Sequence, residues 1–330
     1  MKKRLLLIAA GIIVIASCQK PVSQGDETTE TSQVAPGHRQ CATYEVFQEQ
    51  LKADPSLAEK MDKIEKFTQK FMENPSAYKL VNGVMEVPVV VNVLYNKASE
   101  NIANDQIKSQ ITVLNKDFSG TNSDVGGTPG EFTSVLSGDT KIHFTLQSII
   151  RKKTNKKSWT TNDAMKKTSQ GGLDPTNPTT TLNMWSCNMS GGILGYAQFP
   201  GGKSATDGVV ILYAAFGSRA IYPSGTYATD YDLGRTATHE IGHYFNLRHI
   251  WGDANCGNDF VDDTPIHNSA NYGCPAIPST SNCGGTTHDM MTMNYMDYTD
   301  DACMYMFTAH QATRMQATYA PGGPRASLIP

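Results

Sequence analysis

The segment His239-Glu240-Ile241-Gly242-His243 has the residue types and the spacing of a catalytic zinc site. Residues four apart on a helix share one face, so His239 and His243 can point nitrogen lone pairs at one metal ion. Zinc held by three protein ligands keeps a fourth position for water, and Glu240 can take the proton of that water as it attacks a carbonyl carbon. The segment therefore predicts zinc-assisted hydrolysis, the chemistry that cleaves peptide bonds.

His249 supplies the third imidazole that this chemistry needs. Six residues beyond His243, an unbroken helix would carry His249 too far along its axis to reach the same metal. The helix must therefore end between them, at a turn that favours Gly or, as the next most tolerant residue, Asn. Asn246 stands at that turn. An HExxH segment alone can arise on any amphipathic helix, and the added His249 favours the zinc site over that alternative.

The stretch from His239 to His249 resembles the zinc signature of the metzincin metallopeptidases, HExxHxxGxxH, with Asn246 in place of the family glycine. Two longer segments, HEIGHYFNLRHIWGD from His239 and NYMDYTDDACMYMFTAHQATRM from Asn294, resemble the pappalysin branch of that family, also called cytophagalysins. The resemblance implies that Met296 belongs to a methionine-bearing turn beneath the metal. Met on its own more often only fills a gap in a core.

The elements that must position this site can be placed coarsely. Runs of β-branched and apolar residues predict strands over Val87–Tyr95, Ile142–Ile149 and Val209–Tyr213. Helical spacing of apolar residues predicts a helix over Ala53–Ala77, and another that begins at an Asn104-Asp105 cap. With the resemblance, these elements imply an α+β metzincin-like fold. A twisted mixed five-stranded sheet with backing and active-site helices would form an upper subdomain, above a loop-rich, disulfide-bonded lower subdomain.

Three features are predicted to bind substrate. Gly191–Pro200 would form an edge strand to which an extended peptide adds as another strand, unless it is an ordinary edge blunted by Pro200. The resemblance implies that Tyr298 donates a hydrogen bond to the tetrahedral intermediate, although Tyr is more often simply packed. It also implies that Asp301 lies at the base of the pocket for the residue after the scissile bond, with Asp300 as the competing candidate. A carboxylate there predicts cleavage before Arg or Lys.

The acidic loop NDFVDDTP predicts a calcium site, because clustered carboxylates and a loop carbonyl supply the oxygen ligands that calcium prefers. The loop resembles the calcium-binding loop of pappalysins, which implies Asp259, Thr264 and the Val261 carbonyl as ligands. Its spacing does not fit an EF-hand, and solvated turn acids are the alternative. The expected metal ions are therefore a catalytic Zn²⁺ and a structural Ca²⁺.

The chain has seven cysteines, and the first of them, Cys18, follows a short apolar segment. Four others lie after the zinc segment, where the resemblance implies the disulfides Cys256–Cys283 and Cys274–Cys303. The sequence alone does not choose among the three possible pairings of four cysteines.

Cys41 lies apart from that cluster, in HRQCAT. A thiolate is a good zinc ligand, and Arg39-x-Cys41-x-Thr43 resembles the cysteine switch of pappalysin propeptides, in which a propeptide cysteine occupies the water position. The alternative is a Cys41–Cys187 disulfide; otherwise Cys187 is a buried free thiol.

The N-terminus predicts export. A positive start and an apolar run over 5–15 end in Ile15-Ala16-Ser17-Cys18, which resembles a bacterial lipobox with Cys18 as the lipidated residue. An ordinary signal peptide is the alternative. The expected parts are a lipoprotein signal peptide (1–17), a polar tether and inhibitory propeptide (18–55) and a metallopeptidase catalytic domain (56–330). The zymogen would sit on the outer membrane or cell surface, and activation would release the extracellular enzyme.

The expected partners are protein or peptide substrates and the chain's own propeptide. The formal charge of −3 gives no basic surplus for nucleic acid, membrane contact is expected only through the lipid, and a monomer is expected. Self-cleavage before Lys52, Lys60 or Lys63 would activate the enzyme. The alternative function is a catalytically silent surface lipoprotein that binds peptides or host proteins, which the intact Glu240 disfavours.

Overall fold

The computed structural model describes residues 37–78 and 83–328, all within one compact unit, Val34–Pro330. The predicted signal peptide, the lipidation site Cys18 and most of the predicted tether lie outside the described residues. Among the described residues no helix is long and apolar enough to cross a membrane.

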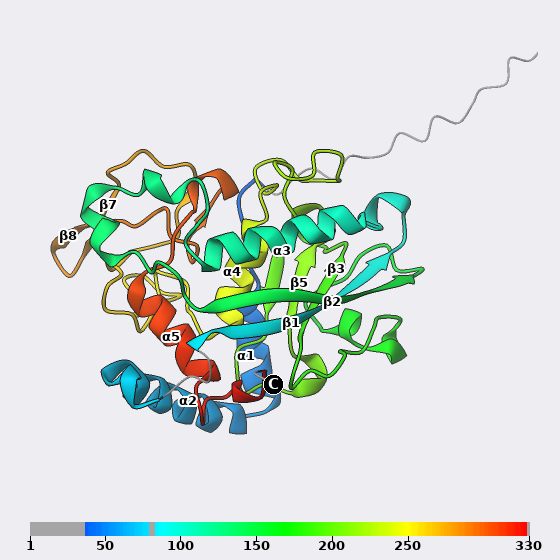
Figure 1. Ribbon diagram of the computed structural model, residues 1–330, viewed down its shortest axis with the longest axis horizontal. Coiled ribbons are helices and arrows are strands. Elements are labelled where there is room, and N and C mark those ends of the chain that lie inside the picture. The colour runs from blue at the N-terminus through cyan, green and yellow to red at the C-terminus, as the bar shows by residue number, and fades with distance from the viewer. Residues whose placement is uncertain (1–36, 79–82, 329–330) are drawn as a thin grey trace, which may run out of the picture. The chain divides into compact units, whose positions relative to one another are not determined.

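Helices and strands are distributed along the whole described chain (Figure 1). The helices are α1 (Thr43–Ala53), α2 (Ser56–Glu73), α3 (Asn104–Phe118), α4 (Arg235–Tyr244) and α5 (Ala309–Tyr319). The strands of the main sheet are β1 (Met85–Tyr95), β2 (Ile142–Lys153), β3 (Leu182–Cys187), β4 (Gly195–Ala197) and β5 (Val209–Leu212). The shorter strands are β6 (Tyr272–Gly273), β7 (Thr280–Cys283), β8 (Thr286–Asp289) and β9 (Tyr298–Thr299).

The main sheet has the strand order β2-β1-β3-β5-β4. Its first four strands are parallel, and β4 at the edge runs antiparallel to β5. This confirms the predicted mixed five-stranded sheet. The valine-rich β1 lies between two partners and is almost wholly buried, as expected of a parallel strand covered on both faces. The buried strand β3 was not predicted from the sequence.

The helices predicted behind the sheet are present. α3 packs on β2 and against α4, and α4 in turn contacts β4 and β5, so both helices lie on the same face of the sheet. The apolar side of α3 is buried in the main core with residues of all five strands. The sheet and α3 thereby fix the position of α4, which carries the first two histidines of the predicted zinc site.

Two local predictions differ from the structure. The helix expected over Ala53–Ala77 is shorter, Ser56–Glu73, and a separate helix α1 precedes it. α3 begins at Asn104 as expected, but no side chain caps it. The Asn104 carboxamide oxygen instead accepts a hydrogen bond of 2.6 Å from Arg151 on β2, so the side chain that could have capped the helix is already engaged.

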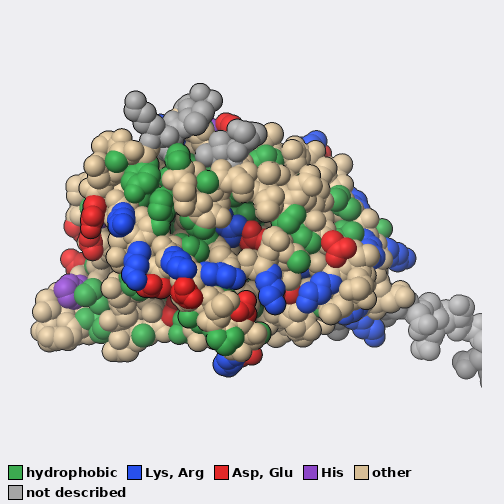
Figure 2. All heavy atoms as spheres, turned by 90° about the horizontal axis from the view of Figure 1, so that it is seen from below, with side chains coloured by type: hydrophobic (Ala, Val, Ile, Leu, Met, Phe, Trp, Pro, Cys, Tyr) green, Lys and Arg blue, Asp and Glu red, His purple; other side chains and the backbone are tan. Residues whose placement is uncertain are grey.

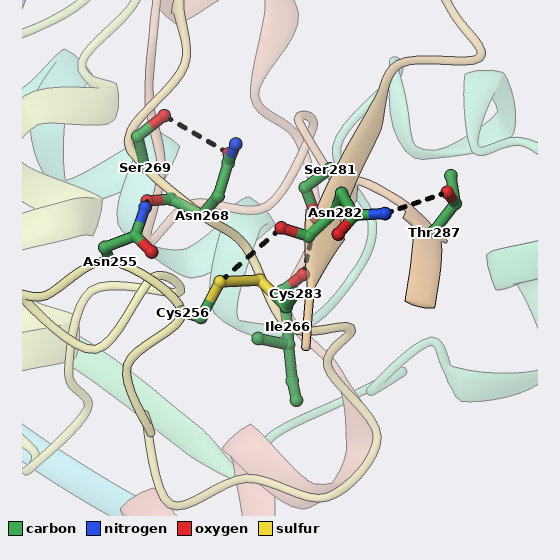
Figure 3. Close-up of a disulfide and its surroundings, with 9 residues drawn as sticks. All are labelled: Asn255, Cys256, Ile266, Asn268, Ser269, Ser281, Asn282, Cys283 and Thr287. Carbon is green, nitrogen blue, oxygen red and sulfur yellow. Dashed lines mark hydrogen bonds between the residues drawn. A yellow bond between two sulfur atoms is a disulfide. The ribbon is translucent and has the colours of Figure 1, made fainter. Parts of the chain in front are cut away.

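The lower part of the unit contains the two predicted disulfides. Cys256–Cys283 and Cys274–Cys303 are bonded, with Cα atoms 5.7 and 5.5 Å apart. Figure 3 shows the first disulfide joining the loop after the zinc segment to the β7–β8 hairpin, where Ser281 also donates to the Ile266 carbonyl. The two disulfides stabilise a segment that has little regular secondary structure.

Besides its apolar packing, α2 is joined to the rest of the unit by an ion pair with α5. Figure 2 shows lysines and acidic side chains side by side on the lower face of the molecule, and exposed pairs of this kind along a helix contribute little to stability. Glu65 of α2, in contrast, accepts two hydrogen bonds, of 2.8 and 2.6 Å, from the fully buried Arg314 of α5. Arg314 also donates to the Asn246 carbonyl at 2.9 Å, so α2 is tied to the turn of the zinc segment.

Candidate metal centre and substrate cleft

The three histidines of the zinc motif converge on one point. His239 and His243 lie on α4, and the Nε2 atom of His243 is 3.2 Å from that of His239 and 3.1 Å from that of His249. α4 ends at Tyr244, and Asn246 adopts the left-handed conformation with φ of 71°. The chain therefore turns where the sequence predicts, which brings His249 back to the face that carries the other two rings.

The environment of each ring fits a zinc ion. His239 Nδ1 lies 2.7 Å from the Tyr295 carbonyl and His243 Nδ1 lies 2.8 Å from the Leu247 carbonyl. Because a carbonyl can only accept, these Nδ1 atoms carry the hydrogens and the Nε2 atoms keep the lone pairs that bind a metal. His249 Nδ1 contacts the Asp253 carboxylate in the same manner.

The histidine pKa values favour the same form. Burial, and after it the neighbouring histidines, hold the pKa of His239 and of His243 well below the usual range, so both rings are neutral. Neutral imidazoles are the form that ligates zinc.

Cys41 completes the group. Its Sγ and the three histidine nitrogens lie within 4.8 Å of one another, the one such cluster of possible metal ligands among the residues described. The thiol lies 3.3 Å from Glu240 Oε2, and the Thr43 hydroxyl donates to the same oxygen at 2.9 Å. Burial raises the pKa of Glu240 to about 7. Cys41 and Cys187 are both free and buried, so the alternative disulfide between them is not formed.

The segment around Cys41 lies along the open edge of β4. Cys41 and Gly195 form a parallel bridge, the Ala42 amide donates to the Gly195 carbonyl at 3.1 Å, and the Leu194 amide donates to the Gln40 carbonyl at 2.9 Å. A side chain at Gly195 would come within 3.0 Å of the Glu240 side chain, so this edge needs glycine. The predicted edge strand is thus present, although it spans only Gly195–Ala197 of the expected Gly191–Pro200.

Arg39 fills a buried pocket at whose base Asp301 lies. The guanidinium donates to Asp301 Oδ1 at 2.6 Å, to the Thr299 carbonyl at 3.0 Å and to the Thr236 hydroxyl at 3.1 Å. Both partners of the ion pair are about 1% exposed or less. Of the two candidate acids, the structure brings Asp301 to this pocket, and the more exposed Asp300 makes no hydrogen bond to Arg39.

Tyr298 and Met296 flank the histidines. The Tyr298 hydroxyl donates to the Cys41 carbonyl at 3.0 Å, and its ring stands edge-on to that of His249 with centroids 4.9 Å apart. Met296 is fully buried beneath α4. A Cβ atom at Gly242 would lie 2.5 Å from the Met296 sulfur, so the glycine of the HExxH segment lets the methionine approach the helix.

In the predicted calcium loop, three oxygen atoms that could ligate the ion lie close together. The Thr264 hydroxyl donates to Asp259 Oδ2 at 2.8 Å and to the Val261 carbonyl at 2.9 Å. Asp259 is buried, and burial raises its pKa to about 7. Asp263 points elsewhere, because its carboxylate accepts hydrogen bonds from Thr308 and from the amide of His310 at the start of α5.

Some residues of the site were missed by sequence reasoning. Asp253 follows His249 by four residues, and a carboxylate at that distance from a ligand histidine was a readable signal for a partner that orients the ring. The carbonyls of Tyr295 and Leu247 carry no signal, since every residue has a carbonyl. Arg248, one residue before His249, was also missed.

Comparisons with known proteins agree with this geometry. Residues 191–320 match the family model of peptidase M43, pregnancy-associated plasma protein-A. Extracellular metalloprotease 1 of Coccidioides posadasii is 30% identical over 256 residues, which are 75% of this chain and 82% of the relative. An extracellular metalloprotease of Arthroderma benhamiae is 31% identical over 241 residues, 69% of this chain and 71% of the relative.

Two solved structures from Tannerella forsythia are similar over most of their length. A promirolysin mutant matches with a TM-score of 0.78 and 37% identity, covering 88% of this chain and 97% of its own. Mature mirolysin in complex with a cleaved peptide matches with a TM-score of 0.71 and 41% identity, covering 74% of this chain and 96% of its own.

The fold, the three converging histidines and these relatives agree on one family. A metalloprotease of this kind uses a catalytic zinc, and His239, His243 and His249 form the three-histidine site for it. The relatives are named as extracellular enzymes, which agrees with the predicted export and with a peptidase rather than a silent binding module. The chain belongs to the pappalysin family of secreted zinc metalloproteases.

Proposed function

We propose that this protein is a zymogen held inactive by Cys41, and that after loss of its propeptide it hydrolyses peptide bonds before Arg or Lys. The observation that carries the proposal is the Arg39 side chain, bound by the buried Asp301 next to the histidine cluster. A buried carboxylate that already binds a guanidinium would bind the same group on a substrate.

Catalysis would use residues that surround the histidines. A bound zinc ion supplies a Lewis acid and lowers the pKa of water. Glu240 would accept the proton of the attacking water, because it adjoins the first ligand and its carboxylate faces the cluster. The Tyr298 hydroxyl, which donates to a carbonyl oxygen at the site, would donate to the negative charge that develops on the substrate carbonyl oxygen.

Latency follows from the position and direction of the propeptide. Cys41 would ligate the metal and exclude water, while Thr43 holds Glu240 through its hydroxyl. A substrate with its basic residue at Asp301 has its preceding residues beyond the histidines, where α1 lies. The propeptide runs in the opposite direction, with Arg39 at Asp301 and α1 beyond the histidines. None of its peptide bonds would therefore be aligned for hydrolysis.

The proposed parts of the chain are a signal peptide (1–17), a lipid-anchored tether from Cys18 that leads into the propeptide, and the catalytic domain. The sequence-based boundary at residue 55 falls between α1 and α2. Two observations favour a later cut. Promirolysin covers 88% of this chain but mature mirolysin only 74%. Lys60 and Lys63 lie inside α2, and helical backbone cannot enter a cleft as an extended strand. We therefore extend the propeptide through α2.

Two further proposals concern the surroundings of the enzyme. The loop of Asp259, Val261 and Thr264 would bind a structural calcium ion, since its carboxylate, carbonyl and hydroxyl oxygens already converge. The zymogen would be a monomeric lipoprotein of the outer membrane or cell surface. Removal of the propeptide would then also remove the lipid and free the enzyme.

One experiment tests the proposed function. Full-length protein is activated by limited proteolysis, loaded with zinc and incubated with a peptide library, and the products are identified by mass spectrometry. We expect cleavage before Arg and Lys, no cleavage by the intact chain, and loss of activity in Glu240→Ala and after chelation. If activated protein binds one zinc ion and cleaves no peptide, the proposed peptidase activity is refuted. Cleavage without a preference for basic residues would refute the proposed role of Asp301.

A further inference from the structure

Arg248 is a half-buried cation beside the zinc histidines, and the structure shows no hydrogen bond from its guanidinium to another described residue. Its guanidinium lies 4.1 Å from the centroid of the Phe199 ring and 5.1 Å from that of Phe47. Its Nε atom is buried and makes no hydrogen bond within the described part of the chain. Buried polar groups are almost always hydrogen-bonded, so the unused Nε donor beside a catalytic centre calls for a ligand.

The acids nearest to Arg248 are engaged elsewhere. Asp253 and Glu65 are its electrostatic neighbours of opposite charge. Asp253 contacts the Nδ1 atom of His249, and Glu65 binds Arg314 with both carboxylate oxygens. Arg314 is itself a neighbouring positive charge. The Arg248 charge is therefore not neutralised by any contact that the structure describes.

The place of Arg248 relates it to the substrate. Phe199 follows the edge strand β4 by two residues, and its ring stands edge-on to that of His243 with centroids 5.5 Å apart. Phe47 of α1 packs edge-on to Phe199 at 5.3 Å and covers the guanidinium. Arg248 thus lies beside the histidines on the side covered by α1, away from the Asp301 pocket. Departure of the propeptide removes Phe47 and uncovers it.

We propose that Arg248 and Phe199 form a substrate subsite for an acidic side chain, two to four residues before the scissile bond. The proposal rests on the proposed function, because the direction of the substrate follows from Asp301. Gly195 pairs with Cys41 beside the histidines, β4 ends at Ala197 and Phe199 follows two residues later, so the subsite falls a few residues before the scissile bond. A carboxylate can accept two hydrogen bonds from a guanidinium whose plane is fixed by an aromatic ring, whereas the Phe47 ring leaves those donors unused.

The test uses mature enzyme and peptides that carry Arg after the scissile bond. Glu, Gln or Lys is placed two, three or four residues before that bond, and kcat and KM are measured for each peptide. At one position we expect Glu to exceed Gln about tenfold in kcat/KM, mainly through KM, equivalent to about 1.4 kcal/mol. Arg248→Gln should abolish this preference and Arg248→Glu should turn it toward Lys. Arg151→Gln, on β2 at the opposite edge of the sheet, should leave it unchanged.

Binding provides a readout that does not depend on turnover. The same peptides are titrated into mature Glu240→Gln protein by fluorescence anisotropy, with zinc content and thermal unfolding recorded for every variant. Tenfold tighter binding of the Glu peptide, lost in Arg248→Gln, supports the subsite even where the proposed function fails. Equal binding and equal cleavage of Glu and Gln peptides at all three positions by protein with native Arg248 overturns it.

Discussion

Replacing Asp301 by Asn removes the negative charge from the pocket that Arg39 fills in the zymogen while keeping the shape of the side chain. The carboxylate oxygen Oδ1 is 2.6 Å from the Arg39 guanidinium, and Oδ2 accepts hydrogen bonds from the amides of Leu233 at 2.8 Å and Arg235 at 3.2 Å. The Asn carboxamide oxygen can keep the backbone partners. Asp301→Asn should therefore preserve the fold and weaken only the recognition of a basic side chain.

The magnitude follows from the burial of this pair. A hydrogen bond to a charged group contributes about 1.5–3 kcal/mol, and the side chains of Arg39 and Asp301 are 1% and 0% exposed, so water does not screen their attraction. A loss of about 2–3 kcal/mol corresponds to about a 30- to 150-fold fall in kcat/KM for a peptide with Arg after the scissile bond. Arg39 uses three of its donors, so Lys peptides should be the poorer substrates from the outset.

The assay compares peptides that differ only in having Arg, Lys or Gln after the scissile bond. Asp301→Asn should reduce the ratio of Arg to Gln cleavage toward one while the Gln peptide keeps its rate. Asp300→Asn is the matched control, since the neighbouring acid is more exposed and makes no hydrogen bond to Arg39. The reasoning is wrong if Asp301→Asn keeps its Arg preference, or if Asp300→Asn loses it.

Three further predictions concern the latency of the uncut chain, calcium binding and stability at acidic pH. Cys41→Ala should raise the peptidase activity of the uncut chain at least tenfold, whereas Cys187→Ala, the other buried free thiol, should stay silent in the same assay. Calcium at 100 times its Kd should stabilise the protein against urea by about 2.7 kcal/mol. Asp259→Asn should lose this gain, and the exposed Asp262→Asn should keep it. Burial lowers the pKa of His267 to about 4, below its unfolded value of about 6.5. The contribution of neutral His267 to the free energy of unfolding is complete above pH 6.5. It is lost as the pH falls toward 4, which lowers the free energy of unfolding by about 3 kcal/mol at most. His267→Gln should flatten this part of the profile; an unchanged acid slope would contradict the assignment.

The zinc trio could be predicted because it depends on local rules. Two histidines four apart on a helix, and Asn246 at a left-handed turn, are features that the sequence itself displays, and the structure reproduces both. Asp300 and Asp301 show the limit of such reasoning. They are adjacent in sequence, and only the packing of the lower part of the unit decides which of them is buried.

The elements that were missed lack local signals. β3 carries Asn and Ser among its buried residues, which hides the pattern of a core strand. α1 begins at Thr43 without a side-chain cap, so nothing in the sequence marks its start. The contact of Glu65 with Arg314 joins residues 249 positions apart, and no periodicity along the chain could suggest it. Long-range contacts of this kind decide how α2 lies on α5.

The parallel alignment of Cys41 with Gly195 has a kinetic consequence. On the function proposed above, a leader that runs backwards through the cleft would not be cut by the active site that it fills, so the activating cut would come from another molecule. Activation by the enzyme itself would then be second order in protein, slow while all molecules are latent and accelerating once a few are free. Dense packing on a surface would shorten the lag, and dilution would lengthen it. The reversed leader would thus make the onset of proteolysis depend on crowding.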